Sequence, residues 1–395
     1  MNDMRPVALT SIPVKVCERL FKTVLLNHVT NMMDPLQFAY LSKRNCSDAI
    51  IVLLEKLYAH LEHTKLGNSV RLMFFDFSSA FNTIQPHLLI GKLQHYNVPS
   101  TLLTWILEYL TNHTQYVKIS STGNQSAVIT SNTGAPQGTV LAPFLFTLYT
   151  ADCRSTESSC PLIKFADDTV MVGLIKKDEN SAYISQLTQF IQYCDSNFLE
   201  LNVSKTKEMI IDYRSKASEP APVNIKDSQV ERVKTYKYLG VTIDNKLNWH
   251  NHIDVTVKKL NTRMYCLRKL NAFNVNSNIL VMFYNAVIAS VWRYCLICWG
   301  GNISSCDKVR LDRVIREAGR IVGESLHTVD AVYDKEVETK LKKILGDDTH
   351  PIHSVLMDSV IPRSGRMRLP YAATNRHSSS FVPRAIKCHN SAFNR

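Results

Sequence analysis

Apolar positions follow two different periods along the first 245 residues, and the period predicts the local structure. In residues 47–63 the apolar side chains recur every three to four positions, which is the spacing of an amphipathic helix. In residues 70–76 they form a short run that small and polar residues end, which is typical of a buried strand. The two patterns predict a mixed α/β unit. Its expected helices are 15–30, 47–63, 86–93, 100–111, 140–149 and 179–198, and its expected strands lie within 70–76, 115–133, 161–175, 207–213 and a hairpin over 223–244.

The pattern becomes helical after this unit. Residues 279–299 are apolar and long enough to cross a bilayer. Asn285 and Arg293 interrupt them, however, and an arginine near mid-span costs roughly 2.5 to 3.5 kcal/mol. We therefore interpret this segment as a buried helix and expect no membrane contact. The helices expected in this region are 251–270, 277–299 and 306–322.

Composition sets the size class and the compartment. A chain of 395 residues exceeds the size at which one core keeps growing, so two or three subdomains are expected. Ten cysteines without an apolar N-terminal signal indicate reduced thiols in a nuclear or cytoplasmic protein. Cys295 and Cys298 are interpreted as core packing, because no second pair lies at zinc spacing. His250 and His252 lack a third ligand and are interpreted as the surface start of a helix.

Charge is divided unevenly along the chain. Residues 1–200 hold 15 basic and 16 acidic side chains, whereas residues 201–395 hold 31 and 18. The second half therefore carries the whole net charge of +12, which suits binding to a polyanion. The alternative is a soluble surface that is simply basic. Residues 346–395 are rich in proline, glycine and arginine and are expected to form a basic tail with little helix.

Two acidic positions next to apolar strands indicate metal chemistry. Asp76 ends one strand, and Asp167 and Asp168 form the tip of an apolar hairpin. Adjacent carboxylates repel each other, and a divalent cation relieves the repulsion. Hard oxygen ligands of this kind can hold the two Mg²⁺ ions of a phosphoryl-transfer site. The alternative for any Asp-Asp pair is a solvated turn, and we assign Asp347-Asp348 to it because no apolar strands flank that pair.

Six short motifs follow one another in a fixed order. They are Arg5-Pro-Val-Ala-Leu-Thr, Phe74-Phe-Asp-Phe-Ser-Ser-Ala-Phe81, Gly134-Ala-Pro-Gln-Gly-Thr-Val-Leu-Ala-Pro143, Phe165-Ala-Asp-Asp168, Leu201-Asn-Val-Ser-Lys-Thr-Lys207 and Tyr238-Leu239-Gly240. The series resembles the ordered motifs of a reverse transcriptase, and most closely those of non-LTR (LINE-type) retrotransposons. The resemblance covers residues 5–245, and the basic helical region that follows is similar to the thumb and C-terminal tail of the same elements.

The resemblance implies a metal site and a primer-binding hairpin. Asp76 and Asp167 correspond to the family's metal-binding aspartates, the Phe77 carbonyl to a backbone ligand, and Asp168 to the third carboxylate. Two Mg²⁺ ions are implied, with Mn²⁺ as an alternative. The segment Tyr238, Leu239 and Gly240 corresponds to the hairpin that grips the primer end.

Further site residues are implied in the same way. Arg5 corresponds to a fingers arginine at the triphosphate, and Gln137 to a residue beside the incoming nucleotide. Phe81, five residues after Asp76, corresponds to the aromatic gate that excludes a 2′-hydroxyl, with an ordinary core phenylalanine as the alternative. Lys205 corresponds to the lysine that protonates pyrophosphate, and the nearby Lys207 leaves that choice open.

The fold implied is α+β, a right-hand polymerase with a ferredoxin-like palm. Its expected parts are partial fingers (1–65), a palm (66–245) with a finger insertion at about 95–133, a helical thumb (246–345) and the basic tail (346–395). The implied activity is RNA-directed DNA synthesis from an RNA template, a DNA primer and dNTPs. There are two alternatives. One is an intron maturase or telomerase-like polymerase, and the other is an inactive remnant that only binds nucleic acid.

We also expect the chain to be the C-terminal portion of a longer polyprotein. Arg5 lies almost at Met1, so the preceding fingers strands and the endonuclease of such elements are not in this sequence.

Overall fold

The computed structural model describes residues 7–62, 67–119, 123–214 and 219–392. Its centre is a five-stranded sheet in the order β4-β5-β1-β6-β9, antiparallel except for the β6/β9 pair. Along the chain, β1, α5, β4, β5, α6 and β6 occur in the order of a ferredoxin-like βαββαβ unit. The strands of this sheet are β1 (Ser69–Phe75), β4 (Leu162–Phe165), β5 (Asp168–Ile175), β6 (Lys207–Ile211) and β9 (Glu231–Arg232).

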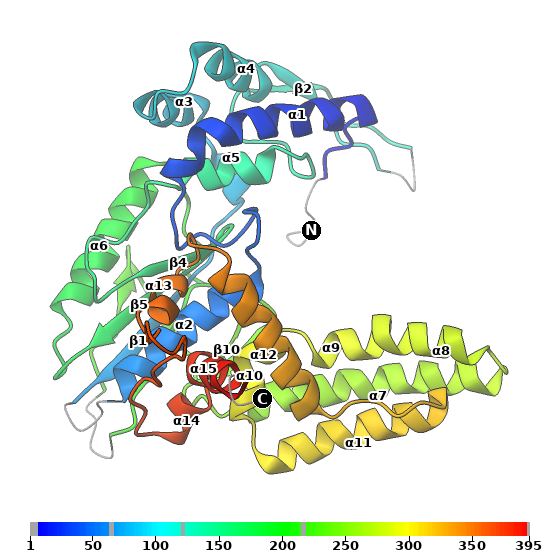
Figure 1. Ribbon diagram of the computed structural model, residues 1–395. Coiled ribbons are helices and arrows are strands. Elements are labelled where there is room, and N and C mark those ends of the chain that lie inside the picture. The colour runs from blue at the N-terminus through cyan, green and yellow to red at the C-terminus, as the bar shows by residue number, and fades with distance from the viewer. Residues whose placement is uncertain (1–6, 63–66, 120–122, 215–218, 393–395) are drawn as a thin grey trace.

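The central strand is buried on both faces because helices cover both faces of the sheet. All seven residues of β1 are buried. Val70, Leu72 and Phe74 point into one hydrophobic cluster, together with α2 and the C-terminal helices. Met73 and Phe75 point into the other, together with α1 and α3 to α6 (Figure 1). These helices are α1 (Ile12–Val29), α2 (Cys46–Leu61), α3 (Pro86–His95), α4 (Ser100–Leu110), α5 (Ala142–Tyr149) and α6 (Ser181–Ser196).

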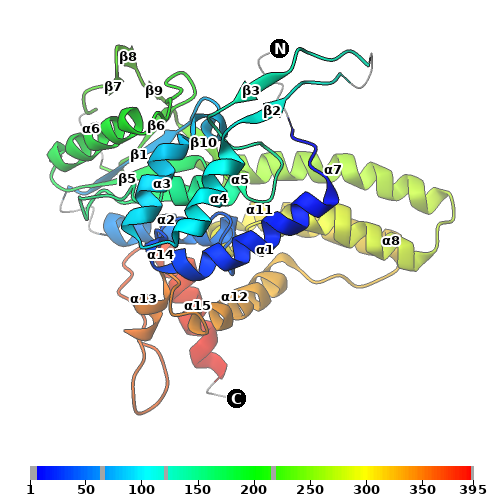
Figure 2. The ribbon, with the colours of Figure 1, turned by 90° about the horizontal axis from the view of Figure 1, so that it is seen from above.

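Beyond the main sheet, the described residues up to 245 form three short hairpins. The expected single hairpin over 223–244 is wrong: this segment forms two hairpins, and β9 between them joins the main sheet. The β2/β3 hairpin projects from the body of the protein (Figure 2). The hairpins are β2 (His113–Gln115) with β3 (Ile129–Ser131), β7 (Asn224–Ile225) with β8 (Ser228–Gln229), and β10 (Thr235–Tyr238) with β11 (Val241–Asp244).

The region after residue 250 is helical, as expected, and α7, α8 and α11 extend side by side away from the sheet (Figure 1). His252 is buried against the Trp299 ring, so its expected surface position is wrong, whereas His250 does lie exposed at the start of α7. The helices are α7 (His250–Ala272), α8 (Ser277–Phe283), α9 (Ser290–Trp292), α10 (Leu296–Trp299), α11 (Ser305–Val322), α12 (Val329–Leu345), α13 (His353–Met357), α14 (Asn375–Ser378) and α15 (Phe381–Ala392).

The apolar segment 277–302 is neither continuous nor buried along its length. A π-helical turn at Tyr284–Ala289 follows α8, and Cys295 has a left-handed φ of 51° that ends the helical run before α10. Met282 in the first half is 69% exposed, whereas Trp299 in the second half is fully buried. By length and composition this is the one segment, among the described residues, that could cross a membrane.

Residues 346–392 do not form a tail. Phe381, Val382, Ala385 and Ile386 of α15 are buried in the same hydrophobic cluster as α2 and α12. Thr374, just before α14, donates a hydrogen bond from its hydroxyl to Glu62 at the end of α2 (2.5 Å). The expectation of little helix was therefore wrong, because these residues pack on elements far away in the sequence.

Candidate active site

Asp76 and Asp168 meet at one end of the central sheet. Phe75 of β1 pairs with Thr169 of β5, so Asp76 and Asp168 are the next residues along the two neighbouring strands. Side chains alternate between faces along a strand, so Asp76 lies on the face of Phe74 and Asp168 on the face of Val170. Both faces belong to the same hydrophobic cluster, so the two carboxylates project on one side of the sheet.

Asp167 lies in the tight turn between β4 and β5. Phe165 pairs with Asp168, which leaves Ala166 and Asp167 as the two turn residues, and Ala166 has a φ of 57°. The Ala166 N–H donates to the Gln37 side chain (3.1 Å), and Gln37 pairs with the edge of β4. A loop far away in the sequence therefore fixes the acidic turn. Asp167 is partly exposed and Asp168 is exposed.

The backbone after Asp76 is oriented by a second antiparallel contact. The Asp76 carbonyl accepts from the Asn202 N–H (2.8 Å), and the Ser78 N–H donates to the Glu200 carbonyl (2.9 Å). Backbone groups of successive strand residues point to opposite sides, so the Phe77 carbonyl faces away from residues 200–202. Residues 200–202 lie on the β6 side of this backbone, because they precede β6. Since β1 lies between β5 and β6, the Phe77 carbonyl faces the side of β5 and Asp168. This orientation suits a backbone metal ligand.

The donor set at this end of the sheet fits Mg²⁺. In the described parts of the chain, no three Asp, Glu, His or Cys side chains converge as a closed metal cage. Mg²⁺ does not need one, because it usually binds one or two carboxylates and takes its other ligands from water and substrate phosphates. Asp76, Asp167, Asp168 and the Phe77 carbonyl supply hard oxygen atoms of this kind.

Three tyrosines surround the carboxylates, and sequence reasoning missed two of them. Tyr236 stacks on Phe74 with ring centroids 4.0 Å apart. Burial, and then the charges of Asp168 and Asp76, raise the pKa of Tyr236. Burial and Asp167 likewise raise the pKa of Tyr40. The alternation Tyr236-x-Tyr238 was a signal that both rings share one face of β10, but nothing in the sequence places Tyr40 here.

The primer-grip candidate is the tip of the β10/β11 hairpin. Leu239 and Gly240 are its two turn residues, with φ of 45° and 83°, as a type I′ turn requires. Tyr238 is buried beside the site, where burial and the Asp168 charge raise its pKa well above the usual value. The hairpin tip therefore lies next to the carboxylates.

Phe81 and the Gly134–Gly138 turn pack together. The Ala135 N–H donates to the Phe81 carbonyl and the Gly134 N–H to the Ile84 carbonyl, both at 2.8 Å. A Cβ on Gly134 would lie 2.8 Å from the Asn82 Cα, which explains the glycine. The Phe81 ring is partly buried, 5.2 Å from the Phe146 ring.

The remaining predicted residues are at least partly exposed or lie outside the described residues. The Gln137 carbonyl accepts from the Ala8 N–H (2.7 Å), and Gln137 is partly exposed. Lys205 is exposed in the turn before β6, whereas the Lys207 ammonium is paired with Glu231 (2.7 Å). Arg5 falls outside the described residues.

The second aspartate pair is not a solvated turn. Asp347 is 8% exposed and forms an ion pair with Arg44, so the expectation for this residue was wrong. Hydrogen bonds from Arg44 and Thr349 outweigh the effect of burial and lower the pKa of Asp347 to about 2. Asp348 is exposed, as expected.

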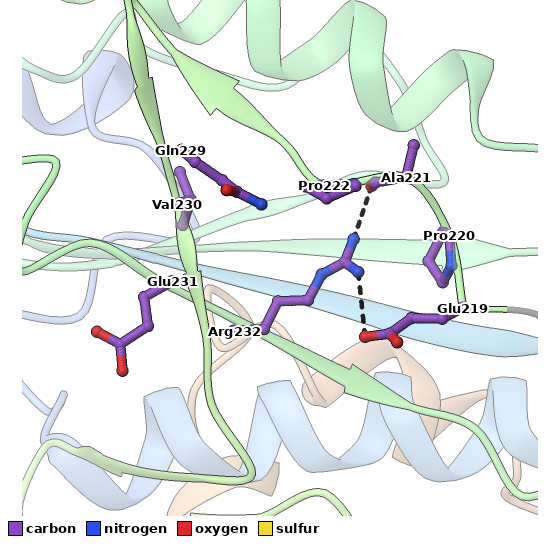
Figure 3. Close-up of a pocket in the computed structure, with 8 residues that line it drawn as sticks. All are labelled: Glu219, Pro220, Ala221, Pro222, Gln229, Val230, Glu231 and Arg232. Carbon is purple, nitrogen blue, oxygen red and sulfur yellow. Dashed lines mark hydrogen bonds and ion pairs between the residues drawn. The ribbon is translucent and has the colours of Figure 1, made fainter.

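A groove of about 640 Å³ lies at the β9 edge of the sheet and contains none of the predicted site residues. Arg232 crosses it and donates to the Ala221 carbonyl (2.6 Å) and the Glu219 carboxylate (3.2 Å), as Figure 3 shows. The groove is therefore closed in part by a structural arginine and is separate from the carboxylate site.

Comparison with known protein families finds one match that includes all of the predicted site residues. The family profile described as "Reverse transcriptase (RNA-dependent DNA polymerase)" matches residues 1–243. A second profile, described as "Alkylated DNA repair protein alkB homolog 8, N-terminal", matches residues 249–290.

Curated relatives come from mobile elements of Drosophila melanogaster. "Probable RNA-directed DNA polymerase from transposon BS" is 25% identical over 76% of this chain and 34% of its own length. "RNA-directed DNA polymerase from mobile element jockey" is 23% identical over 99% of this chain and 43% of its own length. The chain thus spans about a third to two fifths of the curated relatives it matches. Among solved structures, the match to apo telomerase from Candida tropicalis covers 96% of this chain and 58% of that chain, with 11% identity and a TM-score of 0.41.

Proposed function

We propose that this chain, which belongs to the reverse transcriptase (RNA-dependent DNA polymerase) family, extends a DNA primer on an RNA template as part of a LINE-type retrotransposon. In this reaction the primer 3′-oxygen forms a bond to the α-phosphorus of a dNTP, and the bond to pyrophosphate breaks. The observation that carries the proposal is the placement of Asp76, Asp167 and Asp168 at one end of the sheet, beside the β10/β11 hairpin.

Asp76, Asp167 and the Phe77 carbonyl would hold two Mg²⁺ ions, with Asp168 beside them. Bound there, such ions would lower the pKa of the attacking hydroxyl and neutralise the negative charge of the pyrophosphate. Mn²⁺ meets the same oxygen donors. The protein's own contribution is to fix the donors: the Asn202 contact orients the backbone at Asp76, and Gln37 orients the turn at Asp167.

The other site residues act on the nucleotide and the primer. The partly exposed Phe81 ring would exclude a 2′-hydroxyl, and Gln137 would lie beside the base pair being formed. Lys205 is the better candidate to protonate pyrophosphate, because Glu231 already holds the Lys207 ammonium. Arg5 would contact the triphosphate. Leu239 and Gly240 would hold the primer end.

The partners proposed are an RNA template, a DNA primer and dNTPs. The net charge of +13 in residues 201–395 supports binding to the phosphates of nucleic acid. Such binding releases counterions, so the affinity for nucleic acid should fall steeply as the salt concentration rises. A nuclear or cytoplasmic location remains a proposal from the cysteine content.

Single-nucleotide extension of a radiolabelled DNA primer on RNA, with and without Mg²⁺, tests this function. Asp76→Asn and Asp167→Asn each remove one anionic ligand and should slow extension at least about a thousandfold. Asp348→Asn, an exposed aspartate outside the site, is the matched control and should keep the wild-type rate.

The same assay decides between the enzyme and the alternative. Extension by Asp167→Asn at the wild-type rate would overturn the site assignment. A wild-type chain that binds primer–template in a filter assay but never extends it would instead support the inactive remnant that only binds nucleic acid.

A further inference from the structure

The tip of the β10/β11 hairpin has a side-chain anchor from the helical region. The Tyr294 hydroxyl donates a hydrogen bond to the Leu239 carbonyl at 2.9 Å. The Tyr294 ring also lies against Gly240, where an added Cβ would be 3.1 Å from the ring carbon Cε1. Tyr294 therefore contacts both turn residues, although it lies 54 or more residues later in the chain.

The core holds the strands of this hairpin, since Tyr238, Val241 and Ile243 are buried, and Tyr294 adds an anchor at the turn. The hairpin forms a two-stranded sheet that is not part of the five-stranded sheet. An isolated two-stranded hairpin is at best marginally stable in water. Its strands rest on neighbours through Tyr236 on Phe74 and through contacts of β11 with α7. At the turn itself, Leu239 packs against the core cluster, and Tyr294 contacts both Leu239 and Gly240.

Tyr294 is itself held in place. The Trp299 indole N–H donates to the Tyr294 carbonyl (3.1 Å), and the next residue, Cys295, has a left-handed φ that turns the chain here. Such a conformation is unfavourable for a residue other than glycine and persists where the surroundings fix it. Tyr294 is 41% exposed, and its partial burial and the neighbouring Cys46 and Cys295 thiols raise its pKa, so its hydroxyl is protonated and can donate at neutral pH.

We propose that Tyr294 is a positioning residue that fixes the Leu239-Gly240 turn and, through it, the primer 3′ end. This inference rests on the proposed function. Tyr294 would act through the turn and would not touch the reacting atoms. It sets the distance between the primer end and the carboxylates, so its loss affects the rate of the chemical step rather than dNTP affinity.

Tyr294→Phe is the test, because it removes only the hydroxyl. Tyr213→Phe is the matched control: the Tyr213 hydroxyl donates to the Lys246 carbonyl (3.1 Å), beyond the other end of the same hairpin. In single-turnover extension at saturating primer–template, Tyr294→Phe should be about fivefold slower, which corresponds to ~1 kcal/mol for one hydrogen bond. The KM for dNTP should stay within about twofold, and Tyr213→Phe should keep the wild-type rate.

A second measurement separates this inference from the proposed function. Hydrogen exchange of the Leu239–Val241 amides in the free protein should be about fivefold faster in Tyr294→Phe than in Tyr213→Phe, since a lost hydrogen bond of ~1 kcal/mol eases local opening to that extent. A wild-type chain that never extends a primer would overturn the proposed function. An active wild type with Tyr294→Phe at the same rate, or with unchanged exchange at the turn, would overturn the role of Tyr294 alone.

Discussion

Replacement of Asp347 by asparagine should destabilise the protein, although the adjacent Asp348 should tolerate the same change. Asp347 accepts hydrogen bonds from Arg44, and the Thr349 hydroxyl donates to it at 2.7 Å. Both members of the ion pair are buried, with 6% and 8% of their side chains exposed. The pair joins the segment after α12 to the loop before α2. Helix α2 in turn covers one face of the central sheet.

The magnitude follows from the pKa of Asp347, which falls from 3.8 to about 2. This lowering of the pKa corresponds to roughly 2 kcal/mol of stabilisation by the charged form. Because the folded pKa is the lower one, this contribution is present above about pH 4 and is lost as pH falls towards 2. Asparagine also leaves the buried Arg44 without its counter-charge, which can raise the loss towards about 3 to 5 kcal/mol.

Guanidinium unfolding at pH 7 is the assay. Asp347→Asn should lower the free energy of unfolding by about 2 kcal/mol or more, whereas Asp348→Asn should stay within about 0.5 kcal/mol of wild type. Between pH 4 and pH 2 the wild type should lose stability more steeply than Asp347→Asn. Equal stability of the two variants at pH 7 would refute the assignment of a buried ion pair.

Two further predictions concern the palm. Phe81→Val should raise the ratio of ribonucleotide to deoxyribonucleotide incorporation roughly tenfold in single-nucleotide extension, since the ring excludes by bulk. Phe273→Val, at an exposed phenylalanine, is the control, and an unchanged ratio in Phe81→Val would make Phe81 an ordinary core residue. Glu208→Gln should cost about 3 to 5 kcal/mol in thermal or denaturant unfolding, because the buried Arg71 loses its counter-charge. Glu231→Gln, on an exposed side chain, should cost far less, and equal losses would contradict the importance of the buried pair.

The family, the α+β fold and the helix and strand order as far as β6 could be predicted because their signals are local, whereas the two hairpins within 223–244 were predicted as one. The short apolar run in residues 70–76 already indicated a buried strand. Asp76, Asp167 and Asp168 each adjoin such a run, so their meeting at one sheet end follows from strand pairing. The resemblance to a LINE-type reverse transcriptase is confirmed by the family match and by the relatives from mobile elements.

Contacts between distant parts of the chain could not be predicted. Asp347 looked like a solvated turn because its partner Arg44 lies 303 residues away. The apolar residues of α15 do repeat with helical spacing, but the arginine-rich loop before them dominated the composition. Hydropathy detected the apolar segment 277–302, yet it carries no signal for the π-helical turn or for the left-handed Cys295 that places Tyr294.

The packing of α15 also changes how nucleic-acid binding by the C-terminal segment should be tested. Deletion of residues 346–395 would remove core side chains such as Phe381 and Ile386, so lost binding would only report unfolding.

The exposed arginines Arg363 and Arg368 offer a cleaner perturbation, because neither side chain is in the core. If both contact phosphates, Arg363→Gln with Arg368→Gln should reduce the slope of log K against log[salt] by roughly 1.4 to 1.8. Lys176→Gln with Lys177→Gln removes the same charge at the far end of β5 from the carboxylates and should leave the slope unchanged. Fluorescence anisotropy of a labelled primer–template over a range of salt concentrations measures the binding constant, and hence the slope, for all three proteins. Equal slopes for the wild type and the arginine variant would show that the basic residues of this segment only solvate the surface.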